Sequence, residues 1–109
     1  MNVTIEIISE DNMYLLDAVA AGVFDEAINP DYLARYVQEA NHALCVAVSD
    51  GLVVGQARAI IHRHPDTPPE LYIDNVGVTP AYQRRGIARM LVTEIVAVGK
   101  ALGCEDVWV

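Results

Sequence analysis

The first third of the chain carries one strand pattern followed by two helical patterns. Apolar and polar residues alternate over residues 3–8, which predicts a half-buried strand. Ser9 can then cap a helix expected to run from residue 10 to about residue 24. An Asn-Pro pair at positions 29 and 30 predicts the start of a second, shorter helix. The expected buried face of that helix consists of Tyr32, Leu33, Tyr36 and Val37.

The middle of the chain is rich in strand-forming residues. Residues 43–49 and 52–62 are separated by Asp50-Gly51, a signal for a type I′ turn, so these strands are expected to be antiparallel neighbours. Gly55 in the second strand marks a candidate bulge. Three prolines make residues 62–69 a loop or a wider hairpin, and residues 71–78 form the next strand.

The last third predicts a strand-to-helix junction and one more strand. Pro80 prevents the preceding strand from continuing, and Gly103 can end the helix that follows. Residues 106–109 begin a final strand. The expected apolar stripe of the helix consists of Ile87, Leu91, Ile95, Val98 and Leu102.

The junction between strand 71–78 and this helix has the features of a phosphate site. The first turn of a helix offers free N–H groups and the positive end of the helix dipole, and Gly86 lets an anion approach the backbone. Arg84, Arg85 and Arg89 supply three of only seven basic residues in the chain. A surface turn with solvated arginines is the alternative for a lone Gly-x-Ala pair. Two other phosphate loops, Gly-x-x-x-x-Gly-Lys-Ser/Thr and Gly-x-Gly-x-x-Gly after a strand, are absent.

The segment Gln83-Arg84-Arg85-Gly86-Ile87-Ala88, behind Val78-Thr79-Pro80, resembles the signature of the GNAT superfamily of acetyl-CoA-dependent N-acetyltransferases. With the flanking strand, the helix and the order of elements, the resemblance covers nearly the whole chain. It implies an α/β fold with a mixed, mostly antiparallel sheet and helices on both faces. It also implies acetyl transfer from acetyl-CoA to a primary amine by direct attack on the thioester.

The resemblance assigns two groups of residues to acetyl-CoA. Backbone N–H groups of the turn would hold the pyrophosphate, and the edge of the preceding strand would pair with the pantetheine arm. A bulge at Gly77 is expected to splay this strand from its neighbour, and the N–H of Val78 is expected to serve the thioester carbonyl. The expected acetyl-CoA residues are Val76, Gly77, Val78, Gln83, Arg84, Arg85, Gly86, Ile87, Ala88 and Arg89.

The general base is expected on the same strand. Strand alternation places Glu70, Tyr72 and Asp74 on one face. Relatives often carry a glutamate whose register is nearest Tyr72, so either Glu70 or Asp74 could deprotonate the amine, directly or through water. Alternatively, Glu70 and Asp74 are only the polar, solvent-facing side of this strand. His62 and His64 are weaker candidates, since a histidine in a surface loop is usually only solvated.

Composition and charge narrow the range of possible partners and locations. The chain has 109 residues, enough for one domain, and a net charge of -8. Residues 1–57 hold nine acids against Arg35 alone, which argues against nucleic acid and favours a cationic amine substrate, although solubility alone would explain most of these carboxylates. Cys45 and Cys104 are expected to be ordinary thiols, and no metal site is predicted. With no membrane-length apolar run and no signal peptide, a cytoplasmic location is expected.

The end of the sequence suggests an incomplete domain. The family normally continues after the Val107-Trp108-Val109 strand into a further helix and two strands, and its general-acid tyrosine on that helix has no counterpart here. The apolar edge strand predicts a homodimer or larger assembly. The segment from Glu70 to Ile73 is similar to aminoglycoside 3-N-acetyltransferases, while a polyamine, an amino acid or a protein terminus are other acceptors. The alternative function is a CoA-binding or sensing module without turnover.

Overall fold

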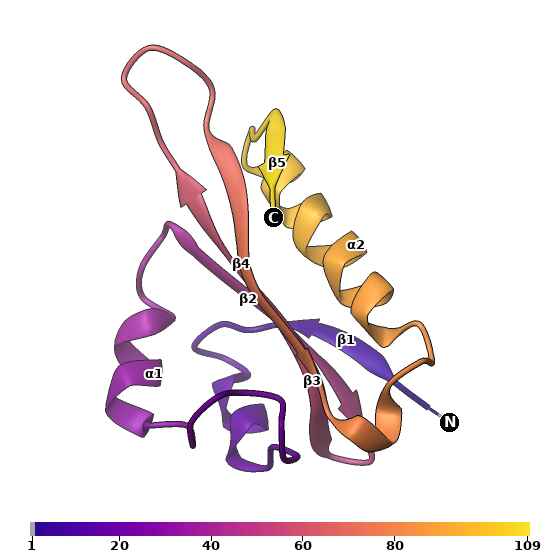
Figure 1. The fold of residues 1–109 in the computed structure, drawn as a ribbon. Coiled ribbons are helices and arrows are strands. Elements are labelled where there is room, and N and C mark those ends of the chain that lie inside the picture. The colour runs from indigo at the N-terminus through magenta and orange to yellow at the C-terminus, as the bar shows by residue number, and fades with distance from the viewer. Residues whose placement is uncertain (1) are drawn as a thin grey trace.

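The computed structural model describes residues 2–109, and its centre is one five-stranded sheet in the order β1-β2-β3-β4-β5 (Figure 1). Strands β1 to β4 are antiparallel neighbours, and β5 is parallel to β4. This confirms the mixed, mostly antiparallel sheet. The strands are β1 Thr4–Ile7, β2 His42–Ser49, β3 Leu52–His62, β4 Glu70–Val78 and β5 Asp106–Trp108.

Two α-helices flank the sheet, one on each face. Helix α2, Ile87–Ala101, packs its buried residues Ile87, Leu91 and Ile95 onto one face. Helix α1, Pro30–Tyr36, and a 3₁₀ helix, Met13–Asp17, lie with the second apolar cluster on the other face. The sheet is therefore the middle of three layers, as the resemblance implied.

The β2–β3 hairpin follows the sequence prediction closely. Asp50 and Gly51 have φ angles of 50° and 77°, the two positive values that a type I′ turn requires. A register shift lies next to Gly55, because Ala47 pairs with Gly55 while Val48 pairs with Val53. A Cβ at Gly55 would stand 3.1 Å from Leu91 Cδ1, so glycine here lets α2 lie close to the sheet.

The long helix predicted for residues 10–24 is wrong. Only Met13–Asp17 is helical, and it is a 3₁₀ helix. The following segment is extended, because Val53 N donates to Ala18 O and Ala20 N donates to Val53 O, each at 2.9 Å. Hydrogen bonds to a neighbouring strand thus replace the intrahelical bonds that the apolar spacing suggested.

The short helix begins where the sequence predicts, but its buried face is smaller. The Asn29 side chain accepts hydrogen bonds from the backbone N–H groups of Asp31 and Tyr32, so it is an N-cap. The side chain of Tyr32 is exposed, at 77%, and none of the α1 residues is fully buried. Helix α1 therefore lies on the rim of the domain, where it can line a cavity.

Helix α2 also differs in its inner stripe. Gly99 lies against the sheet, where an added Cβ would be 2.9 Å from Leu71 Cδ2, and Leu102 is exposed instead of buried. Gly103 follows the helix with a φ of 88°, as a helix-ending glycine should. No helix within residues 2–109 is long and apolar enough to span a membrane. A cytoplasmic location stays a prediction from the sequence.

Candidate active site

The turn before α2 has the open backbone that an anion site needs. Gly86 is the N-cap of α2 with a φ of 79°, and Arg84 is also left-handed, with a φ of 64°. Among residues 2–109, no side chain caps this helix start, so the first N–H groups are not used by a capping residue. A Cβ placed on Gly86 would meet nothing within 4 Å. The space in front of the helix N-terminus is therefore free for a ligand.

The side chains of the turn are cationic and exposed. Arg84, Arg85 and Arg89 all lie on the surface, and the Arg85 guanidinium carbon is 5.2 Å from the centroid of the Tyr82 ring. Gln83 Nε2 donates to Val78 O at 3.0 Å. The signature glutamine therefore ties the turn to the end of β4, and its role is structural in this conformation.

The outer edge of β4 is open beside this turn. Strand β5 pairs only with Glu70 to Tyr72, and within residues 2–109 no strand pairs with β4 on that side beyond Tyr72. Because Thr79 N donates to Val54 O at 2.9 Å, the alternation of an antiparallel ladder turns the backbone groups of Val76 and Val78 away from β3. Their N–H groups thus face the open edge.

The predicted bulge at Gly77 is wrong, because Gly77 lies in regular register opposite Gln56. Glycine is required at this position for another reason. A Cβ at this position would stand 2.3 Å from the carbonyl oxygen of Val23, so only glycine lets the N-terminal segment cross β4 here. The contact fixes that segment at the end of β4, next to the open edge.

The irregularity of β4 lies at Asp74 instead. Arg58 pairs with Asn75 and the next residue of β3, Ala59, pairs with Ile73, so Asp74 is the extra residue of a β-bulge. Arg58 Nε lies 3.6 Å from Asp74 Oδ1, and both side chains are about two-fifths exposed. The bulge therefore brings two consecutive polar side chains, Asp74 and Asn75, beside one arginine.

Two hydrogen bonds attach residues 21–23 to the sheet, in addition to the close contact of Val23 with Gly77. Thr79 Oγ1 donates to Ala21 O at 2.7 Å, and Gln56 Nε2 donates to Val23 O at 3.2 Å. The same amide nitrogen donates to Asn75 Oδ1 at 2.5 Å. Gln56 is fully buried, so its hydrogen bond to Val23 O is shielded from competing water. We call residues 21–23 the anchor segment.

A cavity of about 530 Å³ opens between the residues that follow the anchor segment, helix α1 and the sheet. This volume is in the range of small-molecule sites. Its walls are mainly apolar and aromatic, with the carboxylates of Asp25 and Glu26 on one side and Arg58 and Asn75 on the sheet side. The remaining lining residues are Leu16, Phe24, Ala27, Ile28, Asn29, Tyr32, Leu33, Tyr36 and Leu44.

Tyr36 contributes a hydroxyl to this cavity that stays protonated. Burial, followed by the nearby charge of Asp74, raises the pKa of Tyr36 from 10.0 to about 12. Its hydroxyl donates to Ala43 O at 3.3 Å, and its ring stacks on His42 with centroids 4.5 Å apart. The side chain is thus a fixed, neutral part of the wall.

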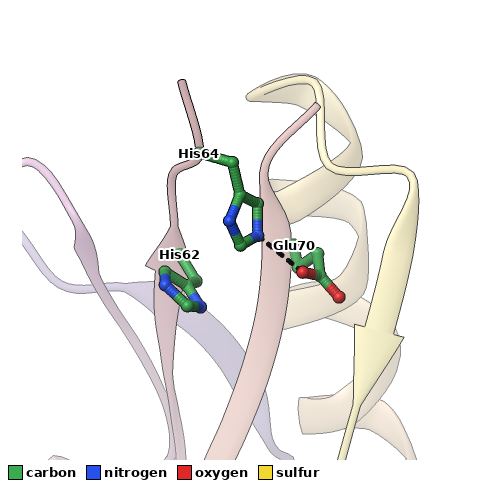
Figure 2. Close-up of side chains that lie close together, drawn as sticks. All are labelled: His62, His64 and Glu70. Atoms are coloured by element: carbon green, nitrogen blue, oxygen red, sulfur yellow. Dashed lines mark hydrogen bonds and ion pairs between the residues drawn. The ribbon is translucent and has the colours of Figure 1, made fainter. Parts of the chain in front are cut away.

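The other predicted base, Glu70, lies at the far end of β4. Its carboxylate is held by Trp108 Nε1, which donates to Oε2, and by His64 Nε2, which lies 2.6 Å from Oε1 (Figure 2). These hydrogen bonds, that of Trp108 first, lower the pKa of the Glu70 carboxyl. Asp74 lies four positions after Glu70, roughly 13 Å along a strand, so the structure does not bring the two carboxylates together.

Several residues of the cavity were not predicted from the sequence. Arg58 and Asn75 lie in segments that were expected only to be strands, and Asp25 and Glu26 lie between the two helices expected in the first third of the chain. The uneven acidity of residues 1–57 was the one signal that pointed to this region. A lone arginine in an apolar strand was a second signal that could have been used.

The sequence and the fold agree with known acetyltransferases. Residues 9–109 match the acetyltransferase (GNAT) family, and the chain belongs to this family. An aminoglycoside N(6')-acetyltransferase type 1 from Salmonella typhimurium is 28% identical over 87 residues, which are 75% of this chain and 53% of that protein. The chain thus spans about half the length of the curated relatives it matches.

Solved structures of aminoglycoside acetyltransferases share the fold. One from an uncultured soil metagenomic sample has a TM-score of 0.82 at 22% identity, covering 99% of this chain and 78% of that chain. The enzyme AAC(6')-Iy, solved with the bisubstrate analog CoA-S-monomethyl-acetylneamine, has a TM-score of 0.77 at 21% identity, covering 98% and 78%. The likeness established here is to aminoglycoside N-acetyltransferases as a group, without a choice between 3-N and 6′-N enzymes.

Proposed function

We propose that this chain carries out acetyl transfer from acetyl-CoA to a primary amine of a small, cationic, aminoglycoside-like molecule. The observation that carries the proposal is the junction of the open Gly86 turn with the free edge of β4. Both features lie at one end of β4, the same end at which the anchor segment crosses the sheet. Family membership and the solved relatives support the same reaction.

Acetyl-CoA would be held mainly by backbone groups. The N–H groups at the start of α2 and the dipole of that helix suit a pyrophosphate, with the arginines of the turn as additional cations. The open edge at Val76 and Val78 suits the amide groups of a pantetheine arm, which would add to the sheet like a strand. An N–H of this edge, that of Val78, would stabilise the negative charge that develops on the thioester oxygen.

Asp74 is the better placed of the two predicted bases. It lies two residues from Val76, roughly 7 Å along the strand, whereas Glu70 is roughly 20 Å away. Both oxygens of Glu70 are already engaged by Trp108 and His64. Asp74 contacts Arg58, a residue of the cavity wall. We therefore assign proton removal from the amine, directly or through a water molecule, to Asp74.

The acceptor would bind in the cavity beside α1. Asp25 and Glu26 offer two carboxylates that attract protonated amines, and the aromatic and apolar walls suit the flat faces of sugar rings. An aminoglycoside is the acceptor class that the names of the relatives favour. A polyamine is the second acceptor class that this acidic cavity suits.

A thiol-release assay tests the proposal. The protein is mixed with acetyl-CoA and a panel of aminoglycosides, polyamines and amino acids, and free CoA thiol is measured over time. Release that depends on an added aminoglycoside supports the proposal. Calorimetric binding of acetyl-CoA without thiol release for any amine would make the chain a CoA-binding module, and the absence of both would reject any role for CoA.

Self-association through β5 is a separate proposal. Strand β5 is the last strand of the sheet, and Val107 and Trp108 are 40% and 50% exposed. Pairing of two such edges would satisfy backbone groups and bury apolar side chains. Light scattering at micromolar concentration should therefore give a dimer or larger species. A monomer that persists at these concentrations would contradict this expectation.

A further inference from the structure

A compact group of three metal-ligand side chains lies at the loop end of the β3–β4 hairpin. His62 and Glu70 are cross-strand partners, and His64 follows in the loop (Figure 2). One ligand atom from each residue lies within 4.8 Å of the other two. The rings of His62 and His64 are 4.4 Å apart between centroids, so both imidazoles lie on the same side of the hairpin.

This spacing is close to that of a coordination shell. Nitrogen and oxygen ligands bind zinc at about 2.0–2.2 Å, so ligand atoms around a tetrahedral ion are roughly 3.3–3.6 Å apart. The ligand atoms already lie within 4.8 Å of one another, so small side-chain rotations would bring them to these positions. His62 is exposed and the other two are partly exposed, which leaves an approach for the ion and room for water ligands.

The carboxylate is also oriented by a neighbour. Trp108 donates its indole N–H to Glu70 Oε2, which leaves Oε1 directed toward His64. The Trp108 ring in turn stacks on Tyr72, with centroids 6.2 Å apart. Hydrogen bonds from outside the ligand set that fix a ligand in this way are a regular part of metal sites.

We propose that His62, His64 and Glu70 bind one divalent transition-metal ion, such as Zn²⁺, Ni²⁺ or Cu²⁺. Two imidazoles and one carboxylate form a donor set that suits these ions and is too rich in nitrogen for Mg²⁺ or Ca²⁺. The ion takes the place of the hydrogen bond between His64 and Glu70. It joins the two ends of the proline-rich loop at residues 63–69, and thereby stiffens the hairpin. The site is independent of acetyl transfer, which we place at the other end of β4.

The single tryptophan of the chain provides the assay. Untagged protein is stripped with a chelator and titrated with Ni²⁺ while the fluorescence of Trp108 is recorded. Because the indole hydrogen-bonds to a ligand of the site, a paramagnetic ion bound there should quench its emission. We expect saturation at one Ni²⁺ per chain and recovery of the emission when excess Zn²⁺, which is diamagnetic, displaces it.

Variants identify the ligands. His62→Ala, His64→Ala and Glu70→Gln should each weaken the binding of Ni²⁺ about tenfold or more, since even changes next to metal ligands cost about 10–100-fold in affinity. The control is His42→Gln, because His42 is the third histidine of the chain, stacks on Tyr36 and does not belong to the group. It should bind as tightly as the unaltered protein.

Two further results would decide against the site. Equal affinity in the His64→Ala variant and the unaltered protein, with both folded by circular dichroism, would show that the ion binds elsewhere. Strong thiolate absorption in the near ultraviolet with Co²⁺ would assign the binding to Cys45 or Cys104 instead. A reduced affinity in all three ligand variants without that absorption supports the proposal whether or not acetyl transfer is found.

Discussion

Replacing Gly86 by alanine should have two effects that can be measured separately: a loss of folding stability and a loss of affinity for acetyl-CoA. With a φ of 79°, an alanine at this position is strained by about 1–2 kcal/mol. No atom lies within 4 Å of the new Cβ, so a steric clash adds nothing to this cost. For a domain of this size we expect the melting temperature to fall by about 4–8 °C for each kcal/mol.

Gly86→Ala should also weaken the binding of acetyl-CoA, and the backbone strain of the free protein does not account for this loss of affinity. The new methyl group would stand in the space that a phosphate needs in order to reach the helix N–H groups. Losing one hydrogen bond to a charged group costs about 1.5–3 kcal/mol, which corresponds to about 10–100-fold in affinity. Calorimetry with acetyl-CoA measures this loss directly.

Gly51 provides the matched control. It has a φ of 77°, also with nothing within 4 Å of an added Cβ, but it lies in the β2–β3 hairpin. Gly51→Ala should therefore lose about 1–2 kcal/mol of folding stability, as Gly86→Ala does, but keep its affinity for acetyl-CoA. If both variants lost affinity equally, or if Gly86→Ala kept it, the assignment of the turn to the pyrophosphate would be refuted.

Three further predictions test other parts of the structure. Asp74→Asn should lower kcat by about 10²–10⁴-fold, as expected for loss of a general base, while Glu70→Gln should change it little; the reverse order in steady-state assays would make Glu70 the base. Gly77→Ala should cost about 2–3 kcal/mol or more in urea unfolding, because neither backbone at this crossing can move aside. Cys45 should resist thiol reagents at neutral pH, since it is buried, and burial is the main cause that raises its pKa from 9.0 to about 11. Its neutral form is favoured in the fold, so its contribution to stability should be complete below pH 9 and decline as the pH rises toward 11; rapid labelling of the native protein would contradict this.

Local patterns predicted the elements whose partners are close in sequence. The Asp50-Gly51 turn and the Asn29 cap depend on a few neighbouring residues, and both are found as expected. The strand, turn and helix around Gly86 were also recognisable, because Pro80 stops the strand and a glycine stands directly before an apolar helical repeat.

The failures occurred where a distant segment decides the structure. Residues 18–20 bond to Val53, which no spacing within the first third of the sequence reveals. The family resemblance led us to expect a bulge at Gly77, but glycine is needed there because the carbonyl of Val23 crosses the strand at this point. The bulge itself is at Asp74, where the sequence has no glycine to mark it. The cavity could not be predicted for the same reason, since its walls come from segments that meet only in the folded chain.

The anchor segment has a consequence for how acceptor specificity can change. Residues 21–23 are held to the sheet by hydrogen bonds from Thr79 and Gln56 and by the close contact at Gly77. The cavity wall that follows includes helix α1, which has no fully buried residue. Because the anchor segment fixes the chain just before this wall, substitutions in residues 25–36 should disturb the sheet little. If this wall binds the acceptor as proposed, grafting residues 25–36 from a relative should transfer acceptor preference, while the proposed acetyl-CoA site keeps its geometry.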